Sequence, residues 1–292
     1  FFSRGDLLVV NDAATVPASL RGVHVESGGE VELRLAARRS IDPRDAHAWR
    51  ALLFGAGDHR TRTEDRPPPP RVAVGDELRL GPLVGRVVRV ERARLLDVAF
   101  EGTASAVWEG IARHGRPVQY AHVPEALATW DVWTSMAGPP VAVEAPSAGF
   151  ALDWAVLRAL AAHGVEVVGL THAAGLSSTG DPALDALLPL DEPYHVPAGT
   201  SLAVGRALAE GRRVVAVGTT VVRALESAAR GTGHVRAGHG VATTRLSAAA
   251  PPRIVTAILS GTHEPGTSHY ALLERFVDAA LLAQATAQMC AL

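Results

Sequence analysis

A glycine and two threonines follow a short apolar run in the second half of the chain. The run covers residues 213–217, and Gly218, Thr219 and Thr220 come directly after it, before a helical pattern. Glycine lets a ligand approach the backbone, and a threonine that caps a helix leaves N–H groups facing an anionic group such as a carboxylate. The pattern therefore indicates either an anion-binding turn or an ordinary strand-to-helix turn with a threonine cap.

Three charged or titratable side chains also follow predicted strands. Arg223 falls in the first turn of the predicted helix, where the dipole does not favour a cation, so either a ligand or acidic partner explains it or it lies on the surface. His263, in a polar loop, can act as acid or base near neutral pH or bond a backbone group. Asp12, which comes after Asn11, is a base, a ligand for hydroxyls or a turn former.

The residue types exclude several kinds of chemistry. The 292 residues include no Lys, which excludes a Schiff base, a pyridoxal phosphate anchor and the P-loop lysine. The single Cys290 excludes an internal disulfide. His234 and His239 lie in a glycine-rich stretch without a third ligand at a suitable spacing, so we interpret them as loop residues and expect no metal.

Two different patterns predict the elements that carry these residues. From about 22 to 102, short alternating segments separated by turns are typical of a small antiparallel barrel. From about 140 onward, apolar runs alternate with helical patterns, which is typical of a mostly parallel sheet covered by helices. Ligands of such sheets bind at the carboxyl ends of the strands. The polar loops described above lie at those ends.

The predicted fold class is therefore α/β: a mostly parallel sheet with covering helices, interrupted by an inserted antiparallel β-barrel domain. We assign residues 1–20 and 140–292 to an α/β domain that binds the ligand, 21–105 to the barrel and 106–139 to a connecting segment. Two of the predicted helices end at glycines: Gly164 closes the helix that Asp153 caps, and Gly231 follows the helix that ends at residue 230.

The composition limits the possible binding partners and the cellular location of the protein. Apolar residues make up 48% and charged residues 20%, and no apolar run reaches the roughly 18 residues that a membrane helix needs. The first residues lack the order of a signal peptide, so we expect a cytoplasmic protein that is a monomer or a weak homo-oligomer and contacts no membrane. With a net charge of -2, any contact with nucleic acid requires a local arginine patch.

Four segments are similar to the S-adenosylmethionine:tRNA ribosyltransferase-isomerase family of queuosine biosynthesis. Residues 214–227, Val-Val-Ala-Val-Gly-Thr-Thr-Val-Val-Arg-Ala-Leu-Glu-Ser, resemble the family signature nearly residue for residue. Residues 145–149 resemble its Ala-Pro-Thr-Ala-Gly segment, and residues 6–20 resemble its first strand. Residues 259–268 keep the His and Pro of its Leu-Thr-Asn-Phe-His-Leu-Pro-Arg-Ser-Thr segment. The matches run from near residue 6 to near 276 in the family's order.

The resemblance implies an α/β domain interrupted by a barrel, and it implies the chemistry. S-adenosylmethionine is the co-substrate and gives its ribosyl part to the aminomethyl arm of a deazaguanine base in tRNA. Adenine and methionine leave, and an epoxycyclopentane results. The sulfonium acidifies the C5' hydrogens, so a positioned base can generate an ylide that opens the ribose and expels adenine.

The resemblance also assigns site residues by position. The implied S-adenosylmethionine-binding residues are Asn11, Ser147, Ala148, Gly149, Gly218, Thr219 and Thr220. The implied catalytic residues are Asp12, Glu192, Arg223 and His263.

The sequence departs from the family pattern at several polar positions. Ala151 stands where the family has a His, and Leu187 and Leu190 stand in place of two His residues ahead of Glu192. Two alternative functions therefore remain open in addition to the tRNA reaction. One is a divergent enzyme that uses S-adenosylmethionine on a small molecule, by ylide or elimination chemistry without tRNA. The other is a catalytically weak binding protein on the same scaffold.

Overall fold

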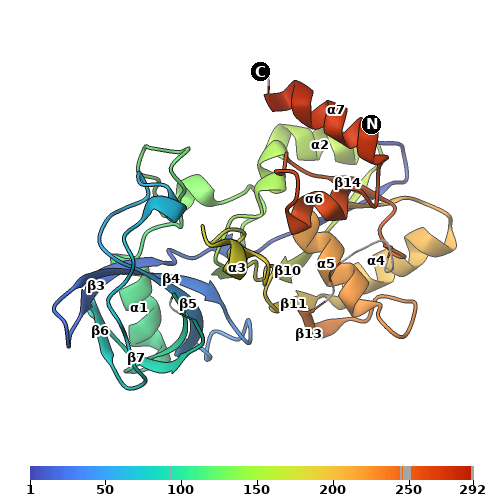
Figure 1. Cartoon of the computed structure of the whole chain (residues 1–292). Helices are drawn as coiled ribbons and strands as arrows, with labels where there is room; N and C mark the ends of the chain where they lie inside the picture. Colours follow the sequence, from blue (N-terminus) through green and yellow to red (C-terminus); the bar gives the residue numbers. More distant parts are fainter. Residues whose placement is uncertain (93, 244, 246–250, 291–292) are drawn as a thin grey trace.

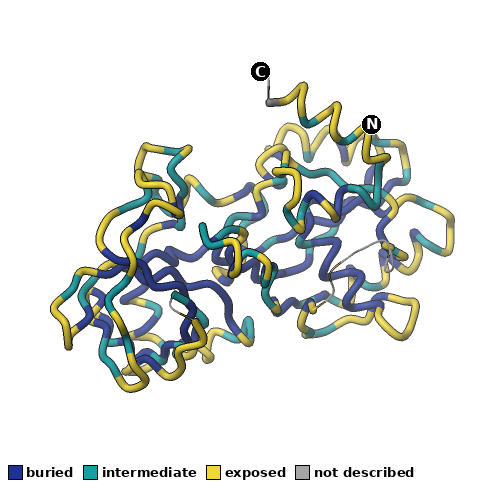
Figure 2. The backbone as a smooth tube through the Cα atoms, in the orientation of Figure 1, coloured by how far each residue is buried: buried dark blue, intermediate teal, exposed yellow. Residues whose placement is uncertain are grey.

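The computed structural model describes residues 1–92, 94–243, 245 and 251–290 of the chain. They form two lobes, one built on a barrel and one on a sheet with helices (Figure 1). Buried backbone runs through the middle of both lobes, whereas exposed backbone lies in the outer loops and in the C-terminal helix (Figure 2).

A six-stranded sheet forms the core of the α/β lobe, in the order β13-β11-β10-β1-β12-β14. Its strands are β1 (Leu7–Asn11), β10 (Glu166–His172), β11 (Glu192–Val196), β12 (Val214–Val217), β13 (Gly238–Ala242) and β14 (Ala257–Leu259). Strands β10, β1, β12 and β14 are parallel, and β11 runs antiparallel to β10 and β13. Every residue of β1 is buried, as a central strand covered on both faces requires.

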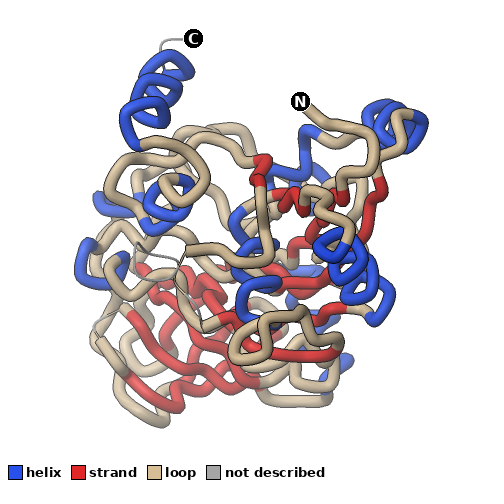
Figure 3. The backbone as a smooth tube through the Cα atoms, turned by 90° about the vertical axis from the view of Figure 1, so that its right-hand side faces the viewer, coloured by secondary structure: helices blue, strands red, loops and turns tan. Residues whose placement is uncertain are grey.

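Helices cover the two faces of this sheet and lie around the outside of the strands (Figure 3). Leu8 and Val10 of β1 point to the face that α2 (Trp154–Ala162) covers, whereas Leu7 and Val9 belong to the cluster that includes α4 (Ala198–Ala209) and α5 (Thr219–Ala228). Asp153 caps α2 by accepting a hydrogen bond from the Val156 N–H, as predicted. The remaining helices are α3 (Pro182–Asp185), α6 (Ser268–Leu273) and α7 (Ala279–Cys290).

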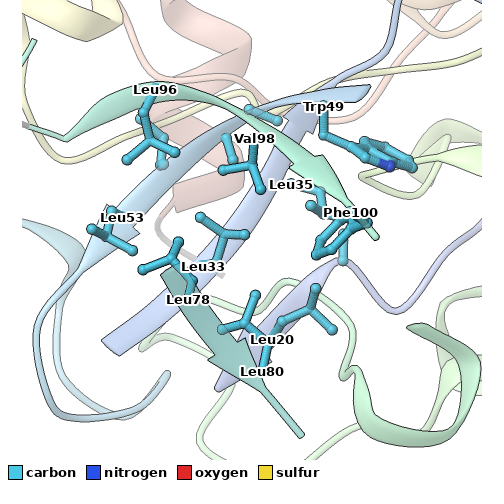
Figure 4. Close-up of a cluster of buried hydrophobic side chains, with 14 of the residues drawn as sticks. Leu20, Leu33, Leu35, Trp49, Leu53, Leu78, Leu80, Leu96, Val98 and Phe100 are labelled. Atoms are coloured by element: carbon cyan, nitrogen blue, oxygen red, sulfur yellow. The ribbon is translucent and has the colours of Figure 1, made fainter. Parts of the chain in front are cut away.

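Strands β3 to β8 form a closed antiparallel barrel. They are β3 (Ser19–His24), β4 (Glu30–Ala37), β5 (Ala48–Phe54), β6 (Glu77–Leu80), β7 (Leu83–Val90) and β8 (Leu95–Phe100). Their inward side chains meet in one cluster (Figure 4), to which Val107 and Ile111 of α1 (Ala104–His114) also belong. Because all six strands fall between β1 and β10 in the chain, the structure confirms an α/β fold interrupted by a barrel. The exact domain boundaries stay a prediction.

One predicted strand was confirmed but lies outside the main sheet, and one residue interpreted as part of a loop lies in a strand. The segment predicted as a strand at 140–144 forms β9 (Pro140–Ala142), which pairs with β2 (Ala14–Thr15) in a separate small sheet. His239 was interpreted as a loop residue but lies in β13, where its ring is 4.5 Å from that of His195 across the strand pair. The helices in the described part of the chain all lack the length and apolar character that crossing a bilayer requires.

A buried group of charges lies in the barrel wall. The Glu32 carboxylate accepts hydrogen bonds from Ser19 Oγ at 2.8 Å, Arg34 Nε at 2.7 Å and Arg66 Nη1 at 2.5 Å. Burial disfavours the ionised carboxylate, but the two guanidinium groups outweigh burial and hold the pKa of Glu32 at about 2. The Arg34 guanidinium in turn lies 5.9 Å from the ring centre of Tyr120.

Replacing Glu32 tests the importance of this group. We expect Glu32→Gln to lower the free energy of unfolding by about 3–5 kcal/mol, because two buried guanidinium groups lose their counter-charge. Urea denaturation at pH 7 measures the change. Glu109→Gln, on the exposed side of α1, is the control and should unfold like the parent. Equal stability of the two variants would contradict the assignment.

Candidate active site

A pocket of about 830 Å³ lies at the carboxyl ends of the parallel strands β12 and β14. Both lobes contribute to it: Arg62, Thr63 and Glu64 come from a barrel loop, and Tyr120 comes from the segment that follows the barrel. This is the edge of an α/β sheet at which ligands bind. Of the predicted site residues, those in the pocket wall are Ser147, Ala148, Glu192, Gly218, Thr219, Thr220, Arg223 and His263.

The glycine turn starts helix α5 in a way that the sequence did not predict. Gly218 itself is the N-cap, with a φ of +88° that favours glycine, and no side chain caps the helix. The predicted threonine cap was therefore wrong. Thr220 Oγ1 is buried and has no hydrogen-bond partner among the described residues. The first turn of α5 thus presents N–H groups, and Thr220 adds a hydroxyl that a ligand can satisfy.

Arg223 is buried and forms an ion pair. It was predicted in the first helical turn or on the surface, and the structure places it in neither. It lies in the second turn of α5, pairs with the buried Glu192, and donates to the carbonyls of Leu190 at 3.1 Å and Ala242 at 2.8 Å. The same Glu192 accepts the Gly175 N–H at 2.6 Å. Burial raises the pKa of Glu192, and the Arg223 charge opposes that rise. An acidic partner therefore explains this arginine.

His172 lies beside this pair and was missed as a site residue. It ends β10, is fully buried, and its Nε2 is 3.4 Å from Glu192 Oε2. Neither ring nitrogen has a hydrogen-bond partner among the described residues. Burial and the Arg223 charge lower the pKa of His172 to about 3. The ring is therefore neutral, and its contact with Glu192 is not an ion pair.

A tyrosine and a glutamate meet on the other side of the pocket. The Tyr120 hydroxyl donates to Glu144 Oε1, and the Ser177 N–H donates to the same oxygen at 3.0 Å. Burial raises the pKa of Glu144, although both hydrogen bonds oppose the rise. Sequence reasoning missed this pair because 24 residues separate its members and no local pattern links them.

Two histidine rings stack beyond the C-terminal end of β14. The His263 and His269 ring centres are 5.0 Å apart, and His263 Nε2 lies 3.1 Å from Ser260 Oγ. Its partner is thus a side-chain hydroxyl instead of a backbone group. Burial lowers the pKa of His263, and burial followed by the neighbouring charges lowers the pKa of His269 to about 4. Both rings are neutral at pH 7, and His269 was missed.

Three predicted residues lie elsewhere in the described structure. The Asn11 amide bonds the backbone N–H and carbonyl of His172 at 2.9 and 3.0 Å, which ties the ends of β1 and β10 together. Asp12 Oδ1 accepts a hydrogen bond from Thr171 Oγ1 at 2.7 Å. Gly149 is buried outside the pocket wall, and a side-chain carbon at this position would come within 3.0 Å of Thr134 Cγ2. Their predicted roles as ligand contacts or base stay predictions.

Glu226 supports the site without entering its wall. Its buried carboxylate accepts the N–H groups of Arg253, Ile254 and Val255 at 2.9–3.0 Å. These residues lead into β14, so Glu226 fixes the strand whose end carries Ser260 and the histidines. The family signature contains this glutamate, but its role becomes visible only from the long-range contacts.

One cluster of the described residues could hold a metal ion. It consists of His24, Glu26 and Asp76 on the barrel, and these are not pocket residues. His24 Nε2 lies 3.0 Å from a carboxylate oxygen of each acid, and its Nδ1 bonds Ser27 Oγ at 2.8 Å. Hydrogen bonds thus hold the cluster together, and we assign it a structural role.

The fold and the pocket together define an α/β enzyme with an inserted barrel. A family model described as queuosine biosynthesis protein matches residues 1–291, and the chain belongs to this family. It is similar to the S-adenosylmethionine:tRNA ribosyltransferase-isomerase of Thermus thermophilus, with 34% identity over 286 residues that cover 95% of this chain and 77% of that protein. The enzyme of the same name from Syntrophotalea carbinolica is 33% identical over 273 residues, covering 91% and 74%.

A solved structure is also similar. The crystal structure of S-adenosylmethionine tRNA ribosyltransferase from Thermotoga maritima has 20% identity and a TM-score of 0.43, covering 98% of this chain and 77% of that chain.

The buried pair predicts a pH-dependent loss of stability when Arg223 is replaced. In Arg223→Met, Glu192 keeps its buried position but loses the charge that favours ionisation. Since its pKa is raised in the folded state, folding favours protonated Glu192, and that contribution is lost as pH rises. We expect a loss of about 3–5 kcal/mol at pH 8 and a smaller one at pH 5.5, measured by urea denaturation.

The double variant Arg223→Met with Glu192→Gln is the matched control. It removes both charges, so the difference between the two pH values should disappear. An equal loss at both pH values in the single variant would contradict this explanation.

Proposed function

We propose that the chain is an S-adenosylmethionine-dependent ribosyltransferase-isomerase. It transfers and isomerises the ribosyl part of S-adenosylmethionine onto 7-aminomethyl-7-deazaguanine in tRNA, with release of adenine and methionine. The observation that carries the proposal is that residues 214–227, which resemble the family signature, form strand β12 and helix α5 and line the pocket at their junction. The names of the relatives support the same activity.

The pocket fits the co-substrate by size and by chemistry. A volume of about 830 Å³ lies in the range usual for ligands of this size. The start of α5 offers N–H groups and the Thr220 hydroxyl to a carboxylate, such as that of the methionyl part. Glu144 and Glu192 also line the pocket. S-adenosylmethionine supplies the acidic hydrogens next to its sulfonium when bound.

The site residues receive roles that follow from their contacts. Gly218, Thr219 and Thr220 bind the co-substrate together with Ser147 and Ala148 on the facing turn. Arg223 orients Glu192, and neutral His263 exchanges protons with the substrates. Asn11 and Gly149 stay proposed contacts to the co-substrate, and Asp12 stays a proposed ribose contact or proton-transfer group. Asn11 and Asp12 also tie the ends of β1 and β10 together.

A groove between the lobes supports tRNA as the acceptor. It has a volume of about 720 Å³ and is lined by residues of β5, β7 and β8 and by residues 187 and 189–191. Its cationic residues are Arg38, Arg39, Arg50, Arg89 and Arg245. Three acidic residues also line it: Glu91, Asp97 and Asp191. Arg50 and Arg89 form ion pairs with Glu91 and Asp97, and Arg38 is buried. Arg39 and Arg245 are therefore the exposed arginines that we propose for contact with a phosphate backbone.

Replacing groove arginines tests the tRNA contact. We expect the double variant Arg39→Ala, Arg245→Ala to bind tRNA more weakly and to lower the slope of binding against salt by about 1 per lost phosphate contact. Binding titrations at several salt concentrations give the slope. Arg113→Ala, an exposed change on α1, is the control. An unchanged slope in the double variant would exclude the groove as the tRNA surface.

The activity itself is tested with S-adenosylmethionine in the presence and absence of tRNA that carries the deazaguanine precursor. We expect mass spectrometry to detect adenine and methionine only when the tRNA is present. Adenine released without tRNA would favour an enzyme that acts on a small molecule or on S-adenosylmethionine itself. No release under either condition would overturn the proposed function.

A further inference from the structure

Glu144 differs from the other acidic groups of the site in its partners. Glu192 is held in an ion pair by Arg223, whereas Glu144 forms no ion pair with a described residue. The Ser177 side chain interacts with Glu144, and the carboxylate accepts hydrogen bonds from the Tyr120 hydroxyl and the Ser177 N–H. Both bonds end on Oε1, and the half-buried side chain lines the pocket. Oε1 is therefore fixed, and none of the hydrogen bonds given for the described residues ends on Oε2.

The barrel lobe fixes the tyrosine that holds Glu144. The Tyr120 ring lies between the Arg34 guanidinium, 5.9 Å from the ring centre, and the imidazole of His122, stacked at 6.2 Å. Arg34 is itself held by the buried Glu32. The hydroxyl also lies 3.2 Å from the carbonyl of Ser178. A chain of contacts thus runs from the barrel wall through Tyr120 to the pocket.

Glu192, the two stacked histidines and Asp12 are less suited than Glu144 to removing a proton from carbon. Glu192 is neutralised by Arg223, and His263 and His269 are buried rings whose pKa values are lowered, which makes them weaker bases. Asp12 is bonded to Thr171 and lies outside the pocket wall. Glu144, in contrast, is a carboxyl group whose burial makes the ionised form more basic.

We propose that Glu144 is a catalytic residue that takes a proton from the carbon bonded to the sulfonium of S-adenosylmethionine, and that Tyr120 is a positioning residue that aims it. The inference rests on the proposed function. In this step the C–H bond breaks, an O–H bond forms at Oε2, and the electron pair stays on the carbon beside the sulfonium. The Arg34 charge lowers the pKa of Glu144, and the Glu144 charge in turn raises the pKa of Glu192.

The test compares Glu144→Gln and Tyr120→Phe with the parent and with Glu109→Gln as control. We expect Glu144→Gln to lower adenine release in the presence of tRNA by about 100-fold or more, the size of a lost acid–base contribution. Its Kd for S-adenosylmethionine, measured by calorimetry, should change by less than about threefold, because the uncharged amide keeps the shape of the side chain.

Tyr120→Phe leaves the carboxyl group in place and tests the positioning role. The Tyr120 hydrogen bond lowers the pKa of Glu144, so its removal should move the acidic limb of the pH–rate profile to higher pH. The pH dependence of stability, measured without ligand, gives a second test. Because folding favours protonated Glu144, the parent should lose stability relative to Glu144→Gln as pH rises from 5 to 8.

The outcomes separate this inference from the proposed function. If the parent releases adenine and Glu144→Gln does so at a comparable rate, the proton-transfer role is wrong and the proposed function stands. If Glu144→Gln loses S-adenosylmethionine binding together with activity, Glu144 is a binding residue, and the role is again wrong. If the parent releases no adenine with tRNA, the proposed function fails and the inference fails with it.

Discussion

The buried pair of Arg223 and Glu192 joins the parts of the α/β lobe that form the pocket. Through it, helix α5 contacts the start of β11, the carbonyl at the end of β13 and, by way of Gly175, the loop that follows β10. A buried ion pair adds little net stability compared with apolar residues of the same size. We therefore interpret it as a device that fixes geometry: three strand ends and one helix are held at the distances at which their polar groups face one cavity.

The barrel is connected to that cavity by the same kind of contact. Glu32, Arg34 and Arg66 form a buried group in the barrel wall, and Arg34 lies against Tyr120. The inserted barrel thus supports one wall of the pocket while its outer strands line the arginine groove. One architecture places a small-molecule pocket and a cationic surface on adjoining faces of the two lobes.

Much of this fold could be predicted from the sequence where the signal is local. The apolar run before Gly218 and the helix after it were predicted correctly, because each depends on neighbouring residues. The threonine cap was wrong because Gly218 adopts a positive φ and becomes the N-cap itself. Strands β11 and β13 were missed because segments such as Gly238–Ala242 lack an apolar run and form by pairing at the sheet edge. Tyr120 and His172 reach the site through contacts with residues distant in sequence, and a local sequence pattern cannot predict such contacts.

The departures from the family pattern also have a physical consequence. Leu187 and Leu190 stand where the family has histidines, and both pack against the barrel core. These changes replace polar groups with apolar contact between the lobes. The residues of the Gly218 turn and the Arg223–Glu192 pair keep the types that the resemblance implies, and they line the pocket.

A crystal structure of the chain with bound S-adenosylmethionine tests the central claim most directly. The account predicts density for the ligand between the Gly218–Thr220 turn and Glu144, with its carboxylate at the start of α5. Density at another place on the molecule, with this pocket empty, would contradict the account.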